Sequence, residues 1–193
     1  RQAHAREPAD EFGAQLARTE AMIGEELQHL RNLVSRFSEF ATLPRIQPTD
    51  VNLAALLPQH LEALATAFDL RYRVACPQEV RVRIDAPLFR QVLANLVRNG
   101  IEANPGLAVT FDVALAERDE VVELTVVNDG VPVPAEVRSR MFEPYVSGRN
   151  SKDNMGLGLA IVRKIVVEHG GEIRYEERGG KPSVEITMPR LSA

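Results

Sequence analysis

The stretch that decides the fold is Gln91-Val92-Leu93-Ala94-Asn95-Leu96-Val97-Arg98-Asn99. Asn95 and Asn99 are four residues apart, so in a helix both carboxamides project from one face, while Val92 and Leu96 cover the other. Carboxamides offer oxygens to a hard cation and N–H groups to phosphate oxygens. The pattern predicts a helix that packs on a core and presents a site for magnesium and phosphate. Paired asparagines on a solvated surface are the plainer alternative.

Two further clusters follow in order, Val127-Asn128-Asp129-Gly130-Val131-Pro132 and Asn154-Met155-Gly156-Leu157-Gly158-Leu159-Ala160. In the second, the glycines fall where a polar loop becomes a helix. Backbone N–H groups at such a place can approach a phosphate without a Cβ in the way. Each cluster is common by itself. The three together indicate a pocket for ATP and Mg²⁺.

Composition limits the class of protein. With 193 residues and 21.4 kDa the chain allows one full domain plus an appendage. Its apolar runs are shorter than a membrane span, so we expect a soluble, cytoplasmic segment whose parent protein is anchored in the inner membrane or free. A net charge of −4 argues against nucleic-acid binding. The one cysteine, Cys76, excludes an internal disulfide and is expected in the core as a small apolar residue.

The first forty residues predict one long amphipathic helix of about thirty residues. Apolar positions recur at steps of three or four: Phe12, Leu16, Ile23, Leu27, Leu30, Val34 and Phe37. Such a helix is too long for one small domain to cover, so a bundle completed by a second chain is expected. Packing on its own domain is the alternative. Glu7-Pro8-Ala9-Asp10 predicts a turn with Asp10 as N-cap, which would make residues 1–7 the tail of a preceding helix.

Two prolines, Pro44 and Pro48, mark a linker at 44–50, after which helices and strands alternate. Helices are predicted at 52–68, at 86–103 with Asp85 as N-cap, and at 156–169. Strands are predicted at 71–75, 80–84, 107–116, 121–128, 172–177 and 183–188. A long polar stretch, 129–155, has little periodicity. Without a run of βαβ units, the order predicts an α+β sandwich with helices on one face of a mixed sheet.

At this point the sequence resembles the catalytic, ATP-binding domain of bacterial sensor histidine kinases of the nitrogen-regulation-like class, in the Bergerat-type ATPase group. The resemblance covers about residues 12–190. It rests on four motifs in the family's order: an N box at Gln91–Asn99, a G1 box at Asn128–Pro134, an F box at Met141–Tyr145 and a G2 box at Gly156–Val162.

Taken residue by residue, the resemblance implies that Asn99 ligates Mg²⁺ and that Asn95 lies close to the phosphates. Gly130 would lie at the adenine, and Gly156 and Gly158 would face the phosphates. The complete set of nucleotide-binding residues that it implies is Asn95, Asn99, Glu102, Ala103, Asn128, Gly130, Val133, Lys152, Met155, Gly156, Leu157, Gly158 and Leu159. Residues 146–155 would form a lid in which Arg149 or Lys152 meets the triphosphate, and His169 resembles a structural part of a helix end.

Three positions depart from the family's pattern. Asn128 replaces the aspartate that accepts a hydrogen bond from adenine, which should weaken binding by about 1 kcal/mol. Pro132 replaces a glycine and removes a backbone donor. Asn154 replaces another glycine, although asparagine tolerates positive φ. The hydrolysing relatives carry a glutamate where Asn95 stands, and a carboxamide takes no proton, so phosphoryl transfer is favoured over hydrolysis.

The phosphoacceptor histidine is expected outside this chain. His4 is too near the linker for the family's spacing, and His29 lies among polar residues. We therefore expect residues 1–43 to be part of a dimerisation hairpin, mainly its second helix, 44–50 a linker, and 51–193 the catalytic domain. The expected partners are a second copy of the chain and the receiver domain of a response regulator, to whose aspartate the phosphoryl group passes.

Two other functions remain open at this level. One is a degenerate Bergerat-type binding or dimerisation module with weak or no affinity for ATP, favoured by Asn128 and Pro132. The other is an anti-sigma-type serine kinase of the same fold. The long helix and the proline linker argue against it.

Overall fold

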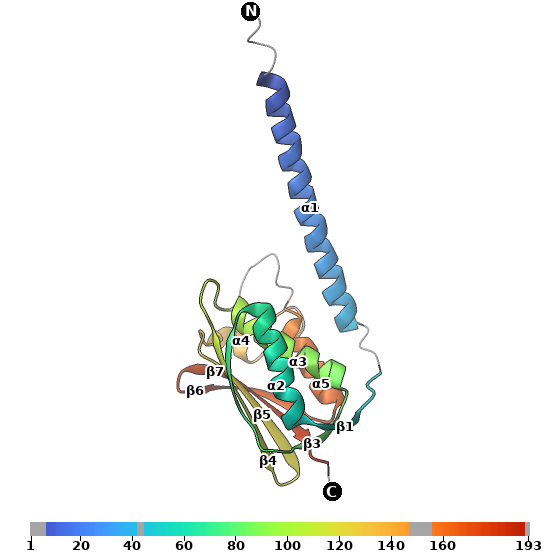
Figure 1. Ribbon diagram of the computed structural model, residues 1–193, viewed down its shortest axis with the longest axis vertical. Coiled ribbons are helices and arrows are strands. Elements are labelled where there is room, and N and C mark those ends of the chain that lie inside the picture. The colour runs from blue at the N-terminus through green and yellow to red at the C-terminus, as the bar shows by residue number, and fades with distance from the viewer. Residues whose placement is uncertain (1–6, 42–44, 147–155, 192–193) are drawn as a thin grey trace, which may run out of the picture. The chain divides into compact units, whose positions relative to one another are not determined.

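The computed structural model describes residues 7–41, 45–146 and 156–191, and the chain divides into two compact units, Arg1–Ala41 and Thr42–Ala193 (Figure 1). No helix in the described ranges combines the length and the apolar character needed to cross a lipid bilayer.

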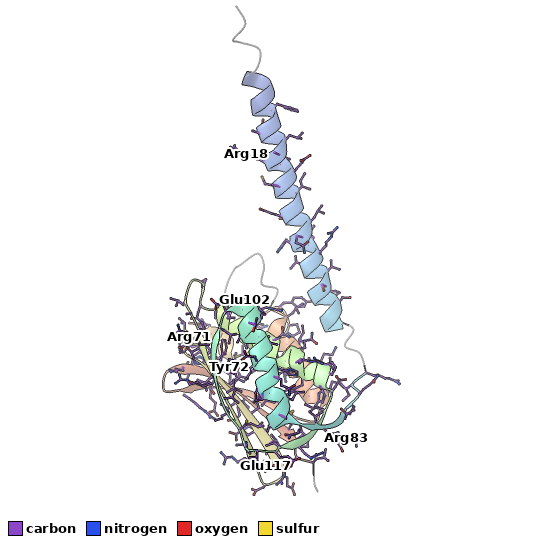
Figure 2. The ribbon with its side chains drawn as sticks, viewed as in Figure 1. Arg18, Arg71, Tyr72, Arg83, Glu102 and Glu117 are labelled. Atoms are coloured by element: carbon purple, nitrogen blue, oxygen red, sulfur yellow. The ribbon has the colours of Figure 1, made fainter. Side chains whose placement is uncertain are left out.

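The first unit is the helix α1, Glu7–Ala41. It confirms the predicted long helix, but the predicted turn with Asp10 as N-cap is wrong. Pro8 lies in the first turn, where a missing N–H breaks no helical hydrogen bond. Side chains stand out along its length (Figure 2). The apolar positions Phe12, Leu16, Ile23, Leu27, Leu30, Val34 and Phe37 are all exposed.

The second unit contains a five-stranded sheet in the order β2-β4-β5-β7-β6. The strands are β2 (Arg71–Ala75), β4 (Thr110–Arg118), β5 (Val121–Asn128), β6 (Glu172–Arg178) and β7 (Lys181–Pro189). β2 and β4 are parallel and the other neighbours antiparallel, which confirms a mixed sheet. The helices α2 (Leu53–Phe68), α3 (Ala86–Glu102) and α5 (Gly158–Glu168) cover one face of it (Figure 1). The fold is therefore α+β, as predicted.

The core lies between these helices and the sheet. Alternate residues of β4, namely Phe111, Val113 and Leu115, are buried, as the period of two in a strand requires. Leu93 and Val97 of α3 belong to the same buried set. This burial holds α3 against the sheet with its polar face turned away.

Three details differ from the sequence-based expectation. Residues Thr49–Asn52, expected to finish the linker and begin a helix, form the strand β1, which pairs antiparallel with β3 (Arg81–Ile84). A short helix, α4 (Ala135–Arg138), interrupts the polar stretch. Cys76 is exposed and not in the core, because it follows the end of the edge strand β2.

Asp85 joins three parts of this unit. Its carboxylate accepts the N–H of Leu88 at 3.1 Å, which confirms it as the N-cap of α3, and the N–H of Gln47 at 2.9 Å. Its own N–H donates to Nε2 of His169 at 2.9 Å. His169 is the C-cap residue of α5, and its Nδ1 lies 2.7 Å from the carbonyl oxygen of Ile165. The start of α3 is thus bound to the end of α5.

Two substitutions of Asp85 should distinguish how much each of its two carboxylate hydrogen bonds contributes to stability. Asp85→Ala loses the cap and the bond to Gln47, so we expect the free energy of unfolding to fall by about 1–2 kcal/mol. Asp85→Ser keeps a capping oxygen for Leu88 and should lose clearly less. Equilibrium urea denaturation of the 193-residue chain measures both. Equal losses in the two variants would show that capping contributes little.

Candidate nucleotide-binding site

The helices α3 and α5 run antiparallel. The predicted phosphate-binding residues meet where the C-terminal part of α3 lies against the start of α5. Asn95 is buried on α3, 8% exposed, and Asn99 follows one turn later. Gly158 opens α5, and a Cβ added there would lie 3.1 Å from Oδ1 of Asn99. The structure therefore brings the carboxamide of Asn99 directly against the N-terminus of α5.

Asn99 has an unmet hydrogen-bonding capacity. Its Nδ2 is buried and has no hydrogen-bond partner within the described residues. A buried, unsatisfied polar group costs about 1–3 kcal/mol, so such a group is retained where a ligand completes it. Because the two amide positions exchange by a flip, the same side chain can give its oxygen to a cation or its N–H to a phosphate. The residues present therefore fit Mg²⁺ and phosphate.

The N-terminus of α5 is also suited to bind a phosphate. Within the described residues, no side chain caps it, so the N–H groups of its first turn remain available to an anion. Leu157 is 2% exposed, so its side chain anchors the helix start in the core and only its backbone can face a ligand. Leu159 lies half-buried in the first turn.

Gly156 must be glycine for two reasons. Its φ is +63°, and a Cβ there would lie 2.5 Å from the carbonyl oxygen of Val146. Its own carbonyl accepts the N–H of Tyr145 at 3.1 Å. This contact joins the residues on either side of 147–155. Arg149, Lys152 and Met155, three of the predicted phosphate-end residues, lie outside the described residues.

The predicted adenine end lies at the C-terminal end of α3, next to Asn99. Asn128 is the last residue of β5, opposite Phe111, and its Cγ would lie 3.6 Å from a Cβ on Gly100. Glu102 and Ala103 are half-buried where α3 ends, and the N–H of Ala103 donates to Asn99. The structure thus places Asn128 one residue along the helix from Asn99.

One residue that the sequence analysis did not single out lies between these groups. Asn104 is 2% exposed, and its side chain bonds both to Gly100 and to Val131. The signal for it was an asparagine at the end of a helix, directly before Pro105-Gly106. Such an asparagine is also typical of an ordinary helix end, which is why the pattern alone does not identify its role.

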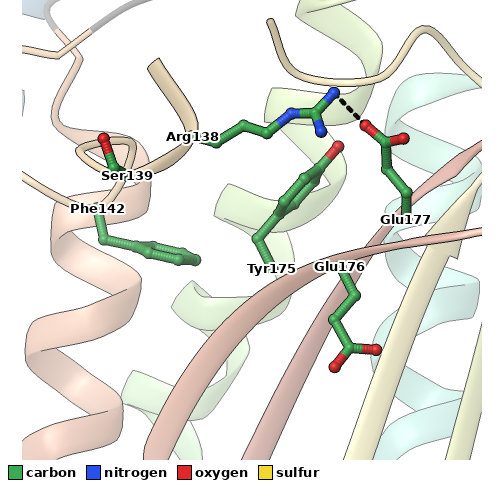
Figure 3. Close-up of a pocket in the computed structure, with 6 residues that line it drawn as sticks. All are labelled: Arg138, Ser139, Phe142, Tyr175, Glu176 and Glu177. Carbon is green, nitrogen blue, oxygen red and sulfur yellow. Dashed lines mark ion pairs between the residues drawn. The ribbon is translucent and has the colours of Figure 1, made fainter. Parts of the chain in front are cut away.

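Val133 lies apart from α3. Its N–H donates to the hydroxyl of Tyr175 at 3.0 Å, and its carbonyl accepts from Arg138 at 2.7 Å. Both partners line a pocket of about 400 Å³ with Ser139, Phe142, Glu176 and Glu177 (Figure 3). Arg138 also pairs with Glu177. The backbone of Val133 is therefore directed toward α4 and β6.

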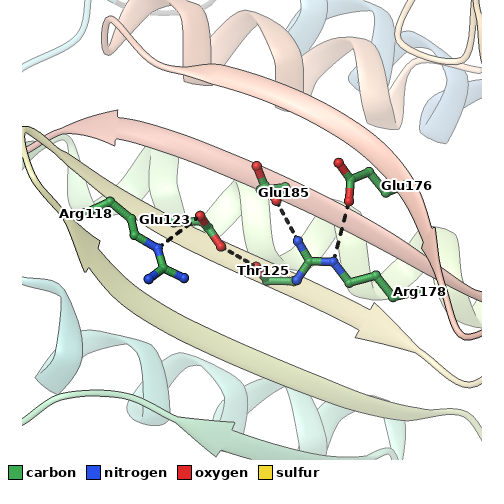
Figure 4. A network of polar contacts seen from close by, with 6 residues as sticks. All are labelled: Arg118, Glu123, Thr125, Glu176, Arg178 and Glu185. Atoms are coloured by element: carbon green, nitrogen blue, oxygen red, sulfur yellow. Dashed lines mark hydrogen bonds and ion pairs between the residues drawn. The ribbon is translucent and has the colours of Figure 1, made fainter.

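The sheet face opposite the helices carries a network of charged side chains (Figure 4). Arg178 pairs with Glu185 at 2.7 Å and Glu176 at 3.6 Å, and Arg118 pairs with Glu123 at 3.7 Å. Arg118 and Arg178 are exposed while Glu123 and Glu185 are half-buried, and ion pairs near the surface contribute about 0–1 kcal/mol each. The described residues of the predicted site lie on the side of the helices.

Asp129 binds the start of the turn that follows β5 to Thr110 through two hydrogen bonds. Its Oδ1 accepts the N–H of Thr110 at 2.7 Å, and its own N–H donates to the carbonyl of Thr110 at 3.2 Å. The hydrogen bond from Thr110 holds the pKa of the Asp129 carboxyl below its ordinary value. The turn is thus attached to the beginning of β4.

Comparison with known proteins agrees with this geometry. Residues 84–192 match the family described as histidine kinase-, DNA gyrase B-, and HSP90-like ATPase. The sensory histidine kinase/phosphatase NtrB of Rhodobacter capsulatus is 29% identical over 183 residues, which cover 87% of this chain and 51% of that protein. The sensor histidine kinase ZraS of Klebsiella oxytoca is 32% identical, covering 91% of this chain and 38% of that protein.

A solved structure, histidine kinase ThkA in complex with the response regulator protein TrrA, matches with a TM-score of 0.71 at 26% identity. The match covers 96% of this chain and 58% of that one. The chain spans about half or less of the length of the curated relatives described above.

The lowered pKa of Asp129 predicts a pH dependence. The unfolded carboxyl titrates near about 3.9. Because the folded pKa is lower, the charged form stabilises the fold above that value, and this contribution is lost as the pH falls through the folded pKa. Asp129→Asn removes the titration and keeps an acceptor oxygen for Thr110. We expect the difference in unfolding free energy between the two proteins to shrink between about pH 5 and pH 3, measured by urea denaturation. A constant difference would contradict the assignment.

Proposed function

This chain belongs to the histidine kinase-, DNA gyrase B- and HSP90-like ATPase family, and on that premise we propose that it is the ATP-binding catalytic part of a sensor histidine kinase. In this role it binds Mg-ATP and transfers the γ-phosphoryl group to a histidine, from which an aspartate of a response regulator receives it. The relatives NtrB and ZraS bear the same kind of name.

The observation that carries this proposal is the meeting of Asn99 with Gly158. An unsatisfied carboxamide lies beside a helix N-terminus that no described side chain caps. Asn99 would hold the cation, Asn95 would lie near the phosphates, and the first N–H groups of α5 would bind phosphate oxygens. Bound Mg²⁺ supplies charge neutralisation of the triphosphate.

The residue at position 95 favours transfer over hydrolysis. Water attack needs a group that takes a proton, and the carboxamide of Asn95 does not. Its burial on α3 leaves it as a hydrogen-bonding group beside the reacting phosphate. A nucleophile from elsewhere then receives the phosphoryl group.

The histidines of the catalytic unit do not suit the role of acceptor. His169 has both ring nitrogens engaged, with Asp85 and Ile165. His60 is half-buried on α2, which carries none of the residues proposed to hold the phosphates. We therefore propose an acceptor histidine outside residues 1–193. We extend the proposal to a response-regulator receiver domain as partner, because ThkA was solved in complex with the response regulator protein TrrA.

The exposed stripe of α1 supports a homodimer. An apolar stripe on a helix of 35 residues is stabilised by partner helices, and two copies of α1 supply them symmetrically. Dimerisation through α1 would form the helical bundle that we propose for this kinase.

A second candidate function is a degenerate nucleotide-binding module used for dimerisation or signalling. The observation in its favour is the pair Asn128 and Pro132, which removes a charge and a backbone donor from the adenine end. Such a module would bind ATP weakly or not at all.

Titration with Mg-ATP separates the two candidates. We expect the 193-residue chain to bind Mg-ATP, and Asn99→Ala to weaken binding by about 10- to 100-fold because a metal ligand is lost. Isothermal calorimetry measures both. Gln59→Ala, which removes an exposed carboxamide from α2, is the matched control and should bind like the parent. No binding at millimolar Mg-ATP would exclude the kinase proposal and favour the degenerate module.

The dimer proposal predicts the effect of a charge on the stripe. Ile23→Glu places a carboxylate among apolar side chains in the bundle, so the variant should sediment as a monomer where the parent is a dimer. Arg18→Glu, a charge reversal on a polar position of the same helix, is the control and should remain dimeric. Analytical ultracentrifugation over a concentration series measures the monomer–dimer equilibrium of the parent and both variants. A dimer of unchanged affinity in Ile23→Glu would overturn the proposed interface.

A further inference from the structure

We propose that Asn104 is a positioning residue for the base end of the nucleotide site. It holds the turn Asp129–Val131, here called the base turn, against the end of α3, and so sets how tightly the adenine is bound. The inference rests on the proposed ATP-binding function and deepens it, since it divides the site into a phosphate end and a base end that depend on different residues.

The geometry gives Asn104 two hydrogen bonds of opposite sense. Its Nδ2 donates to the carbonyl of Gly100 at 2.8 Å, and its Oδ1 accepts the N–H of Val131 at 2.8 Å. Its backbone N–H donates to Ile101 at 2.9 Å. With 2% of its surface exposed, the side chain is a buried bridge from α3 to the base turn.

This pair of bonds selects asparagine over similar residues. The carbonyl of Gly100 needs a donor and the N–H of Val131 needs an acceptor, and a short carboxamide supplies both. Aspartate would set a carboxylate oxygen against the carbonyl oxygen of Gly100. Leucine has the shape but would leave both backbone groups unpaired in a buried place.

Gly130 is fitted to the same side chain. A Cβ on Gly130 would overlap Nδ2 of Asn104 and lie 2.6 Å from its Cγ. The φ of Gly130 is not positive, unlike that of Gly106 or Gly156, so glycine is needed here for close approach and not for backbone conformation. Asn104 and Gly130 therefore form a matched contact.

The base turn is attached at only a few points in the described structure. Asp129 ties its start to Thr110, and Asn104 ties Val131 to α3. Pro132, the next residue, has no N–H to contribute. Asn128, the residue that would face the adenine amino group, immediately precedes the turn. The phosphate end, in contrast, depends on the contact of Asn99 on α3 with Gly158 on α5, in which Asn104 takes no part.

The test compares two probes on the 193-residue chain, Mg-ATP and Mg-tripolyphosphate. The ratio of their dissociation constants measures the contribution of the base and ribose. In Asn104→Ala we expect the dissociation constant for Mg-ATP to rise about tenfold or more, as loss of a buried bridge implies, with that for Mg-tripolyphosphate unchanged within about twofold. A merely structural loss would weaken both probes alike.

Gly130→Ala perturbs the same contact from the other side and serves if Asn104→Ala folds poorly. As a single substitution in the parent, Gly130→Ala should weaken the binding of Mg-ATP more than that of Mg-tripolyphosphate. In the double variant with Asn104→Ala, the added methyl has space, so the two effects should be clearly less than additive. Asn104→Asp should resemble Asn104→Ala, because the donor to Gly100 is lost.

The outcomes separate this inference from the function on which it rests. If the parent binds neither probe, the proposed function and this inference both fall. If the parent binds both probes but Asn104→Ala and Gly130→Ala leave their ratio unchanged, or weaken both probes equally, the inference alone is wrong.

Discussion

The antiparallel contact of α3 with α5 is the constraint on which the rest of this unit depends. At one end Asp85 and His169 join the start of α3 to the end of α5. At the other end the absence of a Cβ on Gly158 lets the helices approach until Asn99 lies against the N-terminus of α5. Two helices joined at one end and closely packed at the other hold a carboxamide and a helix dipole at a fixed separation. That is the geometry a phosphate requires.

The base end is built differently, from a turn held by side chains. Thr110 binds the base turn from β4 through Asp129, and Asn104 binds it from α3. Farther along, Tyr175 and Arg138 hold the backbone of Val133 toward β6 and α4. Single hydrogen bonds attach this part, whereas helix packing forms the phosphate end. The departures from the family pattern, Asn128 and Pro132, both fall in the part with fewer attachments.

Three carboxamides lie at the centre of the site. Asn95, Asn99 and Asn104 lie on one helix and its end, and none of them exchanges a proton in the ordinary pH range. In the function proposed here, a site made of such groups would bind and orient a nucleotide without activating water, which is consistent with transfer to a separate nucleophile. The linker contributes to the same arrangement, since the N–H of Gln47 binds the carboxylate that caps α3.

Much of this architecture was predictable from local pattern. The helix carrying Asn95 and Asn99, the N-cap at Asp85 and the strands β2 and β6 follow from periodicity and from capping chemistry, which act within a few residues of the chain. The strand Thr49–Asn52 could not be predicted from local pattern, because it forms only by pairing with β3, a partner some thirty residues away. The exposure of Cys76 depends in the same way on its surroundings in space.

The site divides along the same line. The sequence by itself determined which chemical groups are present, the carboxamides of the N box and the glycines before α5, because their spacing places them on one helical face or at one helix start. Only the tertiary structure decided that Asn99 meets Gly158, that Asn104 spans from Gly100 to Val131, and that Gly130 is glycine to make room for it. Those contacts join segments far apart along the chain, and a local sequence pattern does not specify which distant segment will pack against it.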